Sequence, residues 1–354
     1  MNGSSLLETN IFRPAALSAF FRRKPLLFPR VHSRSDDLAE TLPPVDPAVR
    51  NDLVEMLAEN FRTEEINELG RLVLGRFDSN SAAGVKENIT LSSRKSARTL
   101  VEYCGKGRSI VSLIKLVVDL DGGIIRGRAV QVDGLDSFLF RLARMGLHYD
   151  FHDRKVVGTR NPVELANWGC LREGRNYDIT VASLDCTGGA RLLEQNGSRR
   201  MEKLYNALWD YCAQKLTVHG GRVWSWAGDG GVMAFCFRDH AQRAVRWALE
   251  VQISMPVFIL SHCDRLPRSI SLRIALDTGR IKFASDTGKI VSNVINYASH
   301  LQKKSTAPGK VSISRMIWDL LGERHRELFA KPGILEDREF LTTPGRLDTL
   351  PGMR

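Results

Sequence analysis

The stretch Gly220-Gly-Arg-Val-Trp-Ser-Trp-Ala-Gly-Asp-Gly-Gly-Val-Met-Ala-Phe235 decides the fold of the C-terminal half of the chain. It contains two runs typical of β-strands, separated by the tight turn Gly228-Asp229-Gly230, and it therefore predicts a hairpin. The glycines beside Asp229 remove side chains from the tip of the hairpin, which leaves room for a metal ion and a polyphosphate near its carboxylate. Taken alone, an Asp-Gly pair indicates only a turn.

A second carboxylate lies upstream of this hairpin. The run Ile179-Thr-Val-Ala-Ser-Leu184 is rich in β-branched residues and predicts a buried strand, which ends at Asp185-Cys-Thr-Gly-Gly189. A carboxylate at a strand end, followed by the glycine turn Gly188-Gly189 and a helix, can hold a metal ion while backbone N–H groups face phosphate oxygens. Alone, Asp185 is better interpreted as a helix cap. Together with Asp229 it offers the hard oxygen ligands that Mg²⁺ or Mn²⁺ prefers, and we assign Cys186 to the same metal site.

Five blocks now stand in order: SLDCTGGA, GGRVWSWAGDGGVMAF, LRIALDTG, VINYASHL and PGKVSISRMIWDLL. In order and spacing they resemble the catalytic domain of class III adenylate and guanylate cyclases, over residues 177–320. The resemblance implies an α+β, ferredoxin-like sandwich that dimerises head to tail, with active sites across the interface. It also implies that Asp185 and Asp229 bind two metal ions, Mg²⁺ or Mn²⁺, and that a nucleoside triphosphate becomes a 3′,5′-cyclic mononucleotide and pyrophosphate.

The sequence departs from this family at the positions that act on the substrate. The partner subunit would supply an Asn, which Asn296 matches, and four residues later an Arg, where this chain has His300. An imidazolium can offer a hydrogen bond and positive charge there, but it has a shorter reach and no bidentate fork. This departure weakens the inference of activity.

Two positions that contact the base in the family also differ. Ser225 stands where members that use ATP carry Lys, and Lys289 stands where they carry Asp. Because Lys donates hydrogen bonds, Lys289 would pair better with guanine O6 or a pyrimidine oxygen than with the adenine amino group. An equally good interpretation is that no base is read at all.

Two functions therefore remain open. The first is a soluble nucleotide cyclase, and the alternative is a catalytically degenerate protein of cyclase fold that serves as a nucleotide sensor or dimerisation scaffold. Ser225, Lys289 and His300 favour the second. We prefer the first, because an inactive protein has no chemical need for both carboxylates and the glycines around them.

Residues 46–122 carry a helical pattern of apolar residues, and a proline-rich boundary precedes them. The blocks DLVEMLAENF, EEINELGRLVLG and SSRKSARTLVEYCGKGRSIVSLIKLV resemble the effector-associated, death-domain-like adaptors of bacterial conflict systems. That resemblance implies a protein partner at this bundle and a bacterial signalling or defence setting. We assign residues 123–176 as a connector, 177–325 as the catalytic domain and 326–354 as a C-terminal tail.

The 354-residue chain has a formal net charge of +11, which fits anionic ligands such as nucleotides. The charge is not gathered into a nucleic-acid-reading motif, so nucleic acid is not an expected partner. Residues 1–45 form a basic leader, which we interpret as disordered; a transit peptide or an anion-binding arm are the alternatives. No stretch reaches the ~18 consecutive apolar residues of a membrane span. Six cysteines without a C-x-x-C pair favour a reducing, cytoplasmic location and no zinc site.

Overall fold

The computed structural model describes residues 42, 44–86, 88–105, 109–262 and 270–348. The predicted basic leader lies outside these residues as far as Thr41, and so does the end of the chain from residue 349.

The first part of the described chain is a group of helices. α1 begins at Pro47, where the carboxylate of Asp46 accepts a hydrogen bond from the Ala48 N–H (2.7 Å) and caps the helix. Apolar residues at helical spacing turn inward from each long helix and form one buried core. The helices are α1 (Pro47–Asn60), α2 (Thr63–Leu74), α3 (Ser79–Ala82), α4 (Ser93–Cys104) and α5 (Ser109–Leu120).

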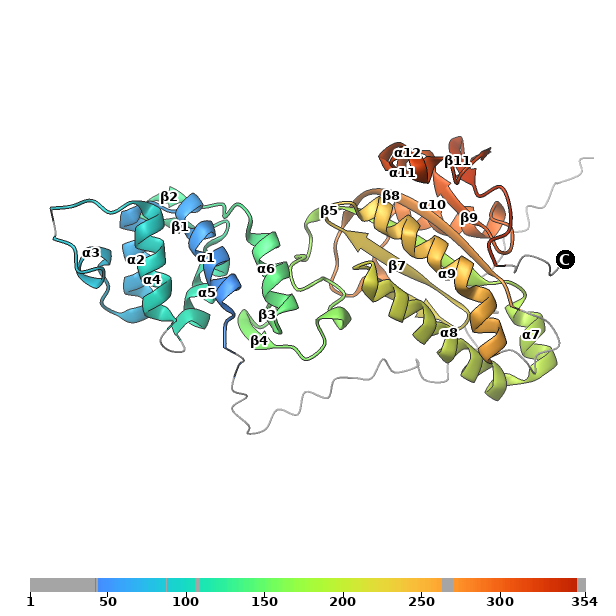
Figure 1. Cartoon of the computed structure of the whole chain (residues 1–354), viewed down its shortest axis with the longest axis horizontal. Helices are drawn as coiled ribbons and strands as arrows, with labels where there is room; N and C mark the ends of the chain where they lie inside the picture. Colours follow the sequence, from blue (N-terminus) through green and yellow to red (C-terminus); the bar gives the residue numbers. More distant parts are fainter. Residues whose placement is uncertain (1–41, 43, 87, 106–108, 263–269, 349–354) are drawn as a thin grey trace, which may run out of the picture. The chain divides into compact units, whose positions relative to one another are not determined.

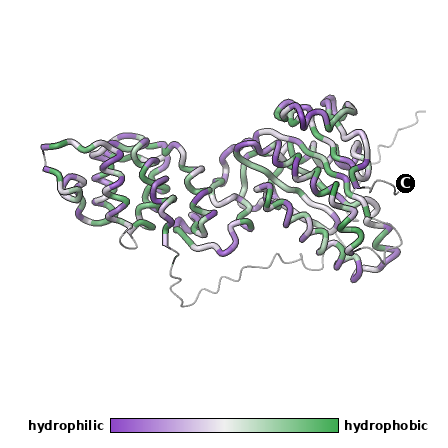
Figure 2. Tube along the Cα trace, in the orientation of Figure 1, coloured by the Kyte–Doolittle hydropathy of each residue, from purple (hydrophilic) through white to green (hydrophobic). Residues whose placement is uncertain are grey.

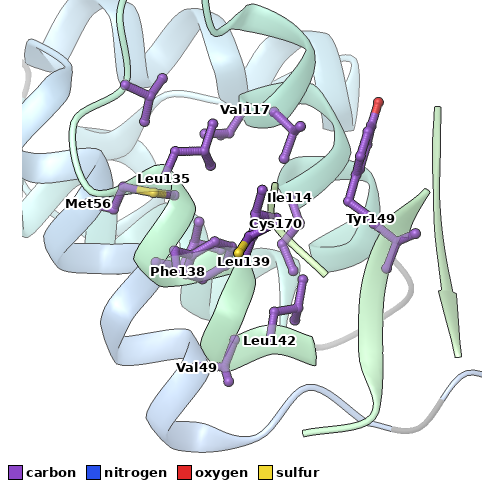
Figure 3. Close-up of a cluster of buried hydrophobic side chains, with 14 of the residues drawn as sticks. Val49, Met56, Ile114, Val117, Leu135, Phe138, Leu139, Leu142, Tyr149 and Cys170 are labelled. Carbon is purple, nitrogen blue, oxygen red and sulfur yellow. The ribbon is translucent and has the colours of Figure 1, made fainter. Parts of the chain in front are cut away.

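The next segment, which we assigned as a connector, has structure of its own. Leu135, Phe138, Leu139 and Leu142 of its helix α6 are buried in the same cluster as residues of α1 and α5, as Figure 3 shows. The segment therefore extends the core of the helical bundle. Its elements are β1 (Ile124–Ile125), β2 (Arg128–Ala129), α6 (Leu135–Arg144), β3 (Leu147–Asp150), β4 (Lys155–Gly158) and the short 3-10 helix η1 (Pro162–Glu164).

A seven-stranded sheet forms the centre of the C-terminal half, in the order β10-β11-β9-β8-β5-β7-β6 (Figure 1). Neighbouring strands are antiparallel except β8 and β9, which are parallel. Two of the strands, β10 and β11, lie in the segment that we expected to be a tail, and they continue the sheet beyond residue 325. The strands are β5 (Asn176–Cys186), β6 (Arg222–Ala227), β7 (Gly230–Cys236), β8 (Leu272–Lys282), β9 (Val311–Ser314), β10 (Lys331–Leu335) and β11 (Arg338–Thr342).

Helices cover both faces of this sheet. Because side chains alternate along a strand, Ile179 and Val181 of β5 join the cluster that contains α10, while Ala182 and Leu184 join the cluster of α8 and α9. The predicted α+β class, with a helical bundle before it, is confirmed. The remaining elements are α7 (Gly189–Asn196), α8 (Ser198–Val218), α9 (His240–His262), the 3-10 helix η2 (Thr287–Lys289), α10 (Asn293–Lys304), α11 (Arg315–Leu320) and α12 (Glu323–Arg326).

Among the described helices, α9 is the one that is long and apolar enough to cross a membrane by length and composition. In the most apolar part of α9, 44% of the stretch is buried within the protein, because one face of the helix packs on β5, β7 and β8. In Figure 2 hydrophobic and hydrophilic residues are interspersed along the helices, as expected for helices that cover a sheet. Length and composition are thus weak grounds for a span here.

Candidate metal and nucleotide site

The fold brings the two predicted metal carboxylates to adjoining strand ends. Asp185 of β5 pairs directly with Gly230, the residue that follows Asp229. The backbone N–H of Cys186 donates a hydrogen bond to the carbonyl oxygen of Asp229, at 3.0 Å. The end of β5 and the tip of the β6–β7 hairpin are therefore one structural unit.

The surroundings of Asp229 leave its negative charge poorly compensated. Burial, and next the charge of Asp185, raise the pKa of the Asp229 carboxyl group above its ordinary value. Tyr205 of α8 lies close by, and its pKa is raised by burial first and then by the charges of Asp229, Cys186 and Asp185. A bound cation would relieve this excess of negative charge, so the residues present fit a divalent metal ion.

The predicted glycine turn lies against the same carboxylate. Gly188 caps α7 with φ +74°, a conformation that other residues rarely adopt. A Cβ atom at Gly189 would lie 2.0 Å from Oδ2 of Asp229. Only glycine at position 189 lets the first turn of α7 approach Asp229 this closely. Contact of Gly188 and Gly189 with phosphate stays a prediction.

The carboxylate of Asp185 has two side-chain partners that were not predicted from the sequence. Arg273 stands directly opposite Asp185 in the pairing of β5 with β8, and its Nη2 forms an ion pair with Oδ2 of Asp185. Nε2 of Gln302 on α10 donates to the same oxygen, at 3.3 Å. Within the described residues, the buried Nε of Arg273 has no hydrogen-bond partner. A metal ion at Asp185 would therefore bind a carboxylate that already forms an ion pair with Arg273.

Cys186 follows Asp185 as the last residue of β5, and its part in metal binding stays a prediction. The side chain is buried in the cluster of α8 and α9, on the face of the sheet opposite to Asp185. Throughout the described ranges, no group of three or more His, Cys, Asp or Glu residues is placed to hold a metal ion. Asp185 and Asp229 would therefore bind Mg²⁺ or Mn²⁺ together with water or phosphate oxygens, as is usual for Mg²⁺.

Asn296 and His300 lie on the outer side of α10. Both are exposed, whereas Tyr297 and Leu301 face the protein interior. Nδ1 of His300 lies 2.7 Å from Oε1 of Glu336, in the turn between β10 and β11. No hydrogen bond or ion pair between described residues joins Asn296 or His300 to the two aspartates.

Ser225 and Lys289 occupy adjoining segments. The hydroxyl group of Thr287 in η2 donates to the carbonyl oxygen of Trp224, at 2.7 Å, and so places η2 beside β6 and Ser225. The side chain of Lys289 is 83% exposed, and Nζ lies 2.8 Å from Oδ2 of Asp286. The hydrogen bond that Lys289 donates to Asp286, and then the charge of Asp286, raise the pKa of Lys289, which keeps the ammonium group charged.

Comparisons with known proteins give a likeness of fold. No family model matches the chain, and no curated protein matches its sequence. Among solved structures, the guanylyl cyclase Cya2 is 18% identical with a TM-score of 0.43, and the match covers 49% of this chain and 95% of that chain. The guanylyl cyclase domain of RhoGC from the aquatic fungus Blastocladiella emersonii is 20% identical with a TM-score of 0.42, covering 50% and 99%.

The adenylyl cyclase CyaB from P. aeruginosa is 18% identical with a TM-score of 0.42, and the match covers 49% of this chain and 98% of that chain. These similarities to adenylate and guanylate cyclase domains extend over about half of the chain.

Proposed function

We propose that the C-terminal half binds a nucleoside triphosphate with divalent metal at Asp185 and Asp229, and converts it to a 3′,5′-cyclic mononucleotide and pyrophosphate. The observation that carries the proposal is the pair of carboxylates at adjoining strand ends, with Gly189 against one of them. In the reaction the ribose 3′-oxygen forms a bond to the α-phosphorus, its proton leaves, and the bond from that phosphorus to the pyrophosphate oxygen breaks.

Each residue of this site has a role that follows from its chemistry. Two bound metal ions would supply Lewis acidity that stabilises the attacking and leaving oxygens. Asp185 and Asp229 would hold them, and the glycine turn before α7 would present backbone N–H groups to the phosphates. A second copy of the chain would bring Asn296 and His300 to the substrate. Their exposure on α10 leaves them available to such a partner, which supports a homodimer.

The base would be met by Ser225 and Lys289, which lie on adjoining segments. A charged ammonium group donates and does not accept, so guanine O6 or a pyrimidine oxygen is a better partner for it than an adenine amino group. Comparison of the four ribonucleoside triphosphates tests this preference. Equal turnover of all four would show that no base is read.

The direct test incubates the purified chain with each ribonucleoside triphosphate and Mn²⁺, and separates the products by chromatography. We expect a cyclic mononucleotide and pyrophosphate from the wild type and none from Asp229→Asn. Asp178→Asn is the matched control, because Asp178 is an exposed residue of the same strand, β5. No cyclic product from any substrate, or equal product from wild type and Asp229→Asn, would refute the proposal.

A second candidate function is a nucleotide sensor or dimerisation scaffold without turnover. It is favoured by the state of His300, because Nδ1 of His300 and Nζ of Lys304 both contact Oε1 of Glu336, at 2.7 Å and 3.3 Å. In that arrangement Nδ1 of His300 is already occupied by a carboxylate of its own chain. Metal-dependent nucleotide binding that Asp229→Asn abolishes, with no product from the wild type, would favour the sensor.

The helical bundle supports a further part of the proposal. We infer that residues 46–122 recruit a protein partner that controls nucleotide turnover in a bacterial signalling or defence setting, within the cytoplasm. The helices of the bundle share one buried core, and Leu72 and Tyr103 are apolar side chains that remain exposed. Leu72→Ser with Tyr103→Ser would then remove partner control and leave basal turnover unchanged.

A further inference from the structure

Helix α9 carries a stripe of exposed aliphatic side chains. Ile253, Val257 and Leu260 are 60%, 65% and 65% exposed. Spacings of four and three residues place them on one face of the helix. The opposite face, with Val251 and Met255, is buried against the sheet. We call Ile253, Val257 and Leu260 the α9 stripe; a contiguous apolar patch of this kind is typical of an interaction surface.

A group of cations lies at the start of the neighbouring helix α8. Arg199, Arg200 and Lys203 line an open hollow of ≈ 590 Å³, together with Asn196, Gly197 and Ser198. No acidic residue stands in the first turn of α8. We call this feature the basic hollow.

The α9 stripe and the basic hollow lie at the same end of the sheet. Tyr211 of α8 fixes the alignment, because its hydroxyl group lies 2.7 Å from the carbonyl oxygen of Val251 and 2.7 Å from Oγ of Ser254. The other end of α8 is tied to the first half of α9, since Lys215 pairs with Glu250 at 3.0 Å. The helices are thus antiparallel, and the start of α8 lies beside the end of α9 (Figure 1).

Helix geometry places the cations level with the end of the stripe. Lys203 precedes Tyr211 by eight residues, which corresponds to about 12 Å along α8. The same distance along α9 from Ser254 reaches its last turn, just beyond Leu260. The cationic and aliphatic side chains therefore lie at the same level of two neighbouring helices.

We propose that the α9 stripe and the basic hollow form a docking surface for an anionic lipid bilayer. Aliphatic side chains beside cations match the interface of an anionic bilayer, where acyl chains meet phosphate groups. Helix α9, with one face buried on the sheet, would lie parallel to the membrane surface at this interface. The outward face of a helix is convex and offers no groove for a peptide. The chain's net charge of +11 adds attraction to a negatively charged surface.

The test is flotation of the full chain with vesicles of phosphatidylcholine, either alone or mixed with phosphatidylglycerol. We expect binding to the anionic vesicles that weakens as salt rises. Ile253→Ser/Val257→Ser/Leu260→Ser should lower this binding about tenfold or more. The variant loses the favourable transfer of three aliphatic side chains from water into the bilayer. The matched control, Leu72→Ser/Ile89→Ser/Ile334→Ser, changes three side chains that are 60%, 49% and 78% exposed elsewhere, and should bind as the wild type does.

The cations have a test of their own. Arg199→Gln/Lys203→Gln should lower binding to anionic vesicles about 30-fold, or about fivefold for each charge removed, and should not alter binding to neutral vesicles. Thermal melts of all variants check that the fold is kept.

Three outcomes would overturn the proposal. The first is wild-type protein that binds no vesicles, or binds neutral and anionic vesicles equally. The second is a stripe variant that floats as the wild type does, since residues outside the stripe, such as the basic leader, would then carry the binding. The third is self-association, without lipid and without flotation, that the stripe variant abolishes; the stripe would then be an interface between copies of this chain.

Discussion

Asp229 is the residue on which the chemistry of the site depends most. Burial, and then the charge of Asp185, raise its pKa, so the folded protein holds a carboxylate whose charge is disfavoured. Asp185 differs, because Arg273 and Gln302 both contact it. The two carboxylates therefore stand in unlike surroundings, and a metal ion would change the balance of charge at both.

Gly189→Ala tests the close approach of α7 to Asp229. The added Cβ would lie 2.0 Å from Oδ2 of Asp229, so that carboxylate or the helix must move. We expect Mn²⁺ binding and turnover to fall at least about tenfold, the effect of a misplaced ligand or its neighbours on metal affinity. Isothermal titration with Mn²⁺ measures the change. Gly322→Ala is the control, because a Cβ there meets no atom within 4 Å, and an equal loss in both variants would contradict this account.

Arg273→Gln tests the cation that neighbours Asp185. The guanidinium group repels a metal ion at that carboxylate, so its removal should tighten Mn²⁺ binding several-fold in the absence of nucleotide. Arg273→Lys keeps the charge and should bind Mn²⁺ about as the wild type does. Weaker binding by Arg273→Gln than by Arg273→Lys would mean that Arg273 positions Asp185 for the metal ion instead of opposing it.

The segment between α5 and β5 is held to the end of α5 by a buried ion pair. The side chain of Asp121, just after the end of α5, is 3% exposed and forms an ion pair with Arg172, which also contacts Asp136 of α6. Burial alone would raise the pKa of Asp121, but the Val132 N–H and Arg172 lower it below its ordinary value. The lowered pKa means that this carboxylate stabilises the folded protein in its charged form.

The stability that Asp121 contributes should depend on pH. A carboxyl group with a lowered folded-state pKa stabilises fully above its unfolded-state pKa, and this stability is lost as pH falls through the folded-state pKa. We expect Asp121→Asn to lower the free energy of unfolding by about 3 kcal/mol at neutral pH, because it removes the buried one of the two carboxylates that pair with the largely buried Arg172. The loss should shrink below about pH 4.

Urea unfolding at several pH values measures this difference. Asp133→Asn, at an exposed position in the same segment, should have no such effect. A loss of stability that is independent of pH would show that packing, and not charge, explains the role of Asp121.

Local sequence patterns predicted the elements that carry the two aspartates. A β-branched run fixes β5, and the Gly228-Asp229-Gly230 turn fixes the hairpin, so both carboxylates could be placed at strand ends. Arg273 was missed because it meets Asp185 only through the register of β5 with β8, which no local pattern determines.

The β10–β11 hairpin was also missed, for a different reason. Its turn uses Glu336 and Asp337 with φ +53° and +59°, where a hairpin turn usually carries Asn or Gly. In addition, Pro332 and Gly333 interrupt the pattern of its first strand. A local reading therefore favoured a tail at a place where the sheet continues.

At the scale of the whole molecule, a second copy of the chain is needed if Asn296 and His300 act on the substrate. Both are exposed on α10, and within the described residues neither forms a hydrogen bond or an ion pair with Asp185 or Asp229, so each site of the proposed dimer would combine two chains.

Mixing two inactive variants tests this arrangement. Asp229→Asn lacks one half of the site and Asn296→Ala lacks the other, so a mixed dimer should contain one intact site. We expect each variant alone to be inactive and the mixture to recover up to about one quarter of the wild-type rate, because random pairing makes at most half of the dimers mixed and each mixed dimer has one intact site of two. Cyclic nucleotide is measured as the mixing ratio changes. No recovery at any ratio, with mixed dimers present in native mass spectra, would contradict a shared site.

The most direct test of the central claim, that Asp185 and Asp229 hold divalent metal, is electron paramagnetic resonance of Mn²⁺ titrated into the purified chain with a nucleoside triphosphate analogue. The signal of free Mn²⁺ falls as the ion is bound. The account predicts strong uptake by the wild type and by Asp178→Asn, and loss of uptake in both Asp185→Asn and Asp229→Asn beyond the ions held by the nucleotide itself. Equal uptake by wild type and both aspartate variants would contradict it.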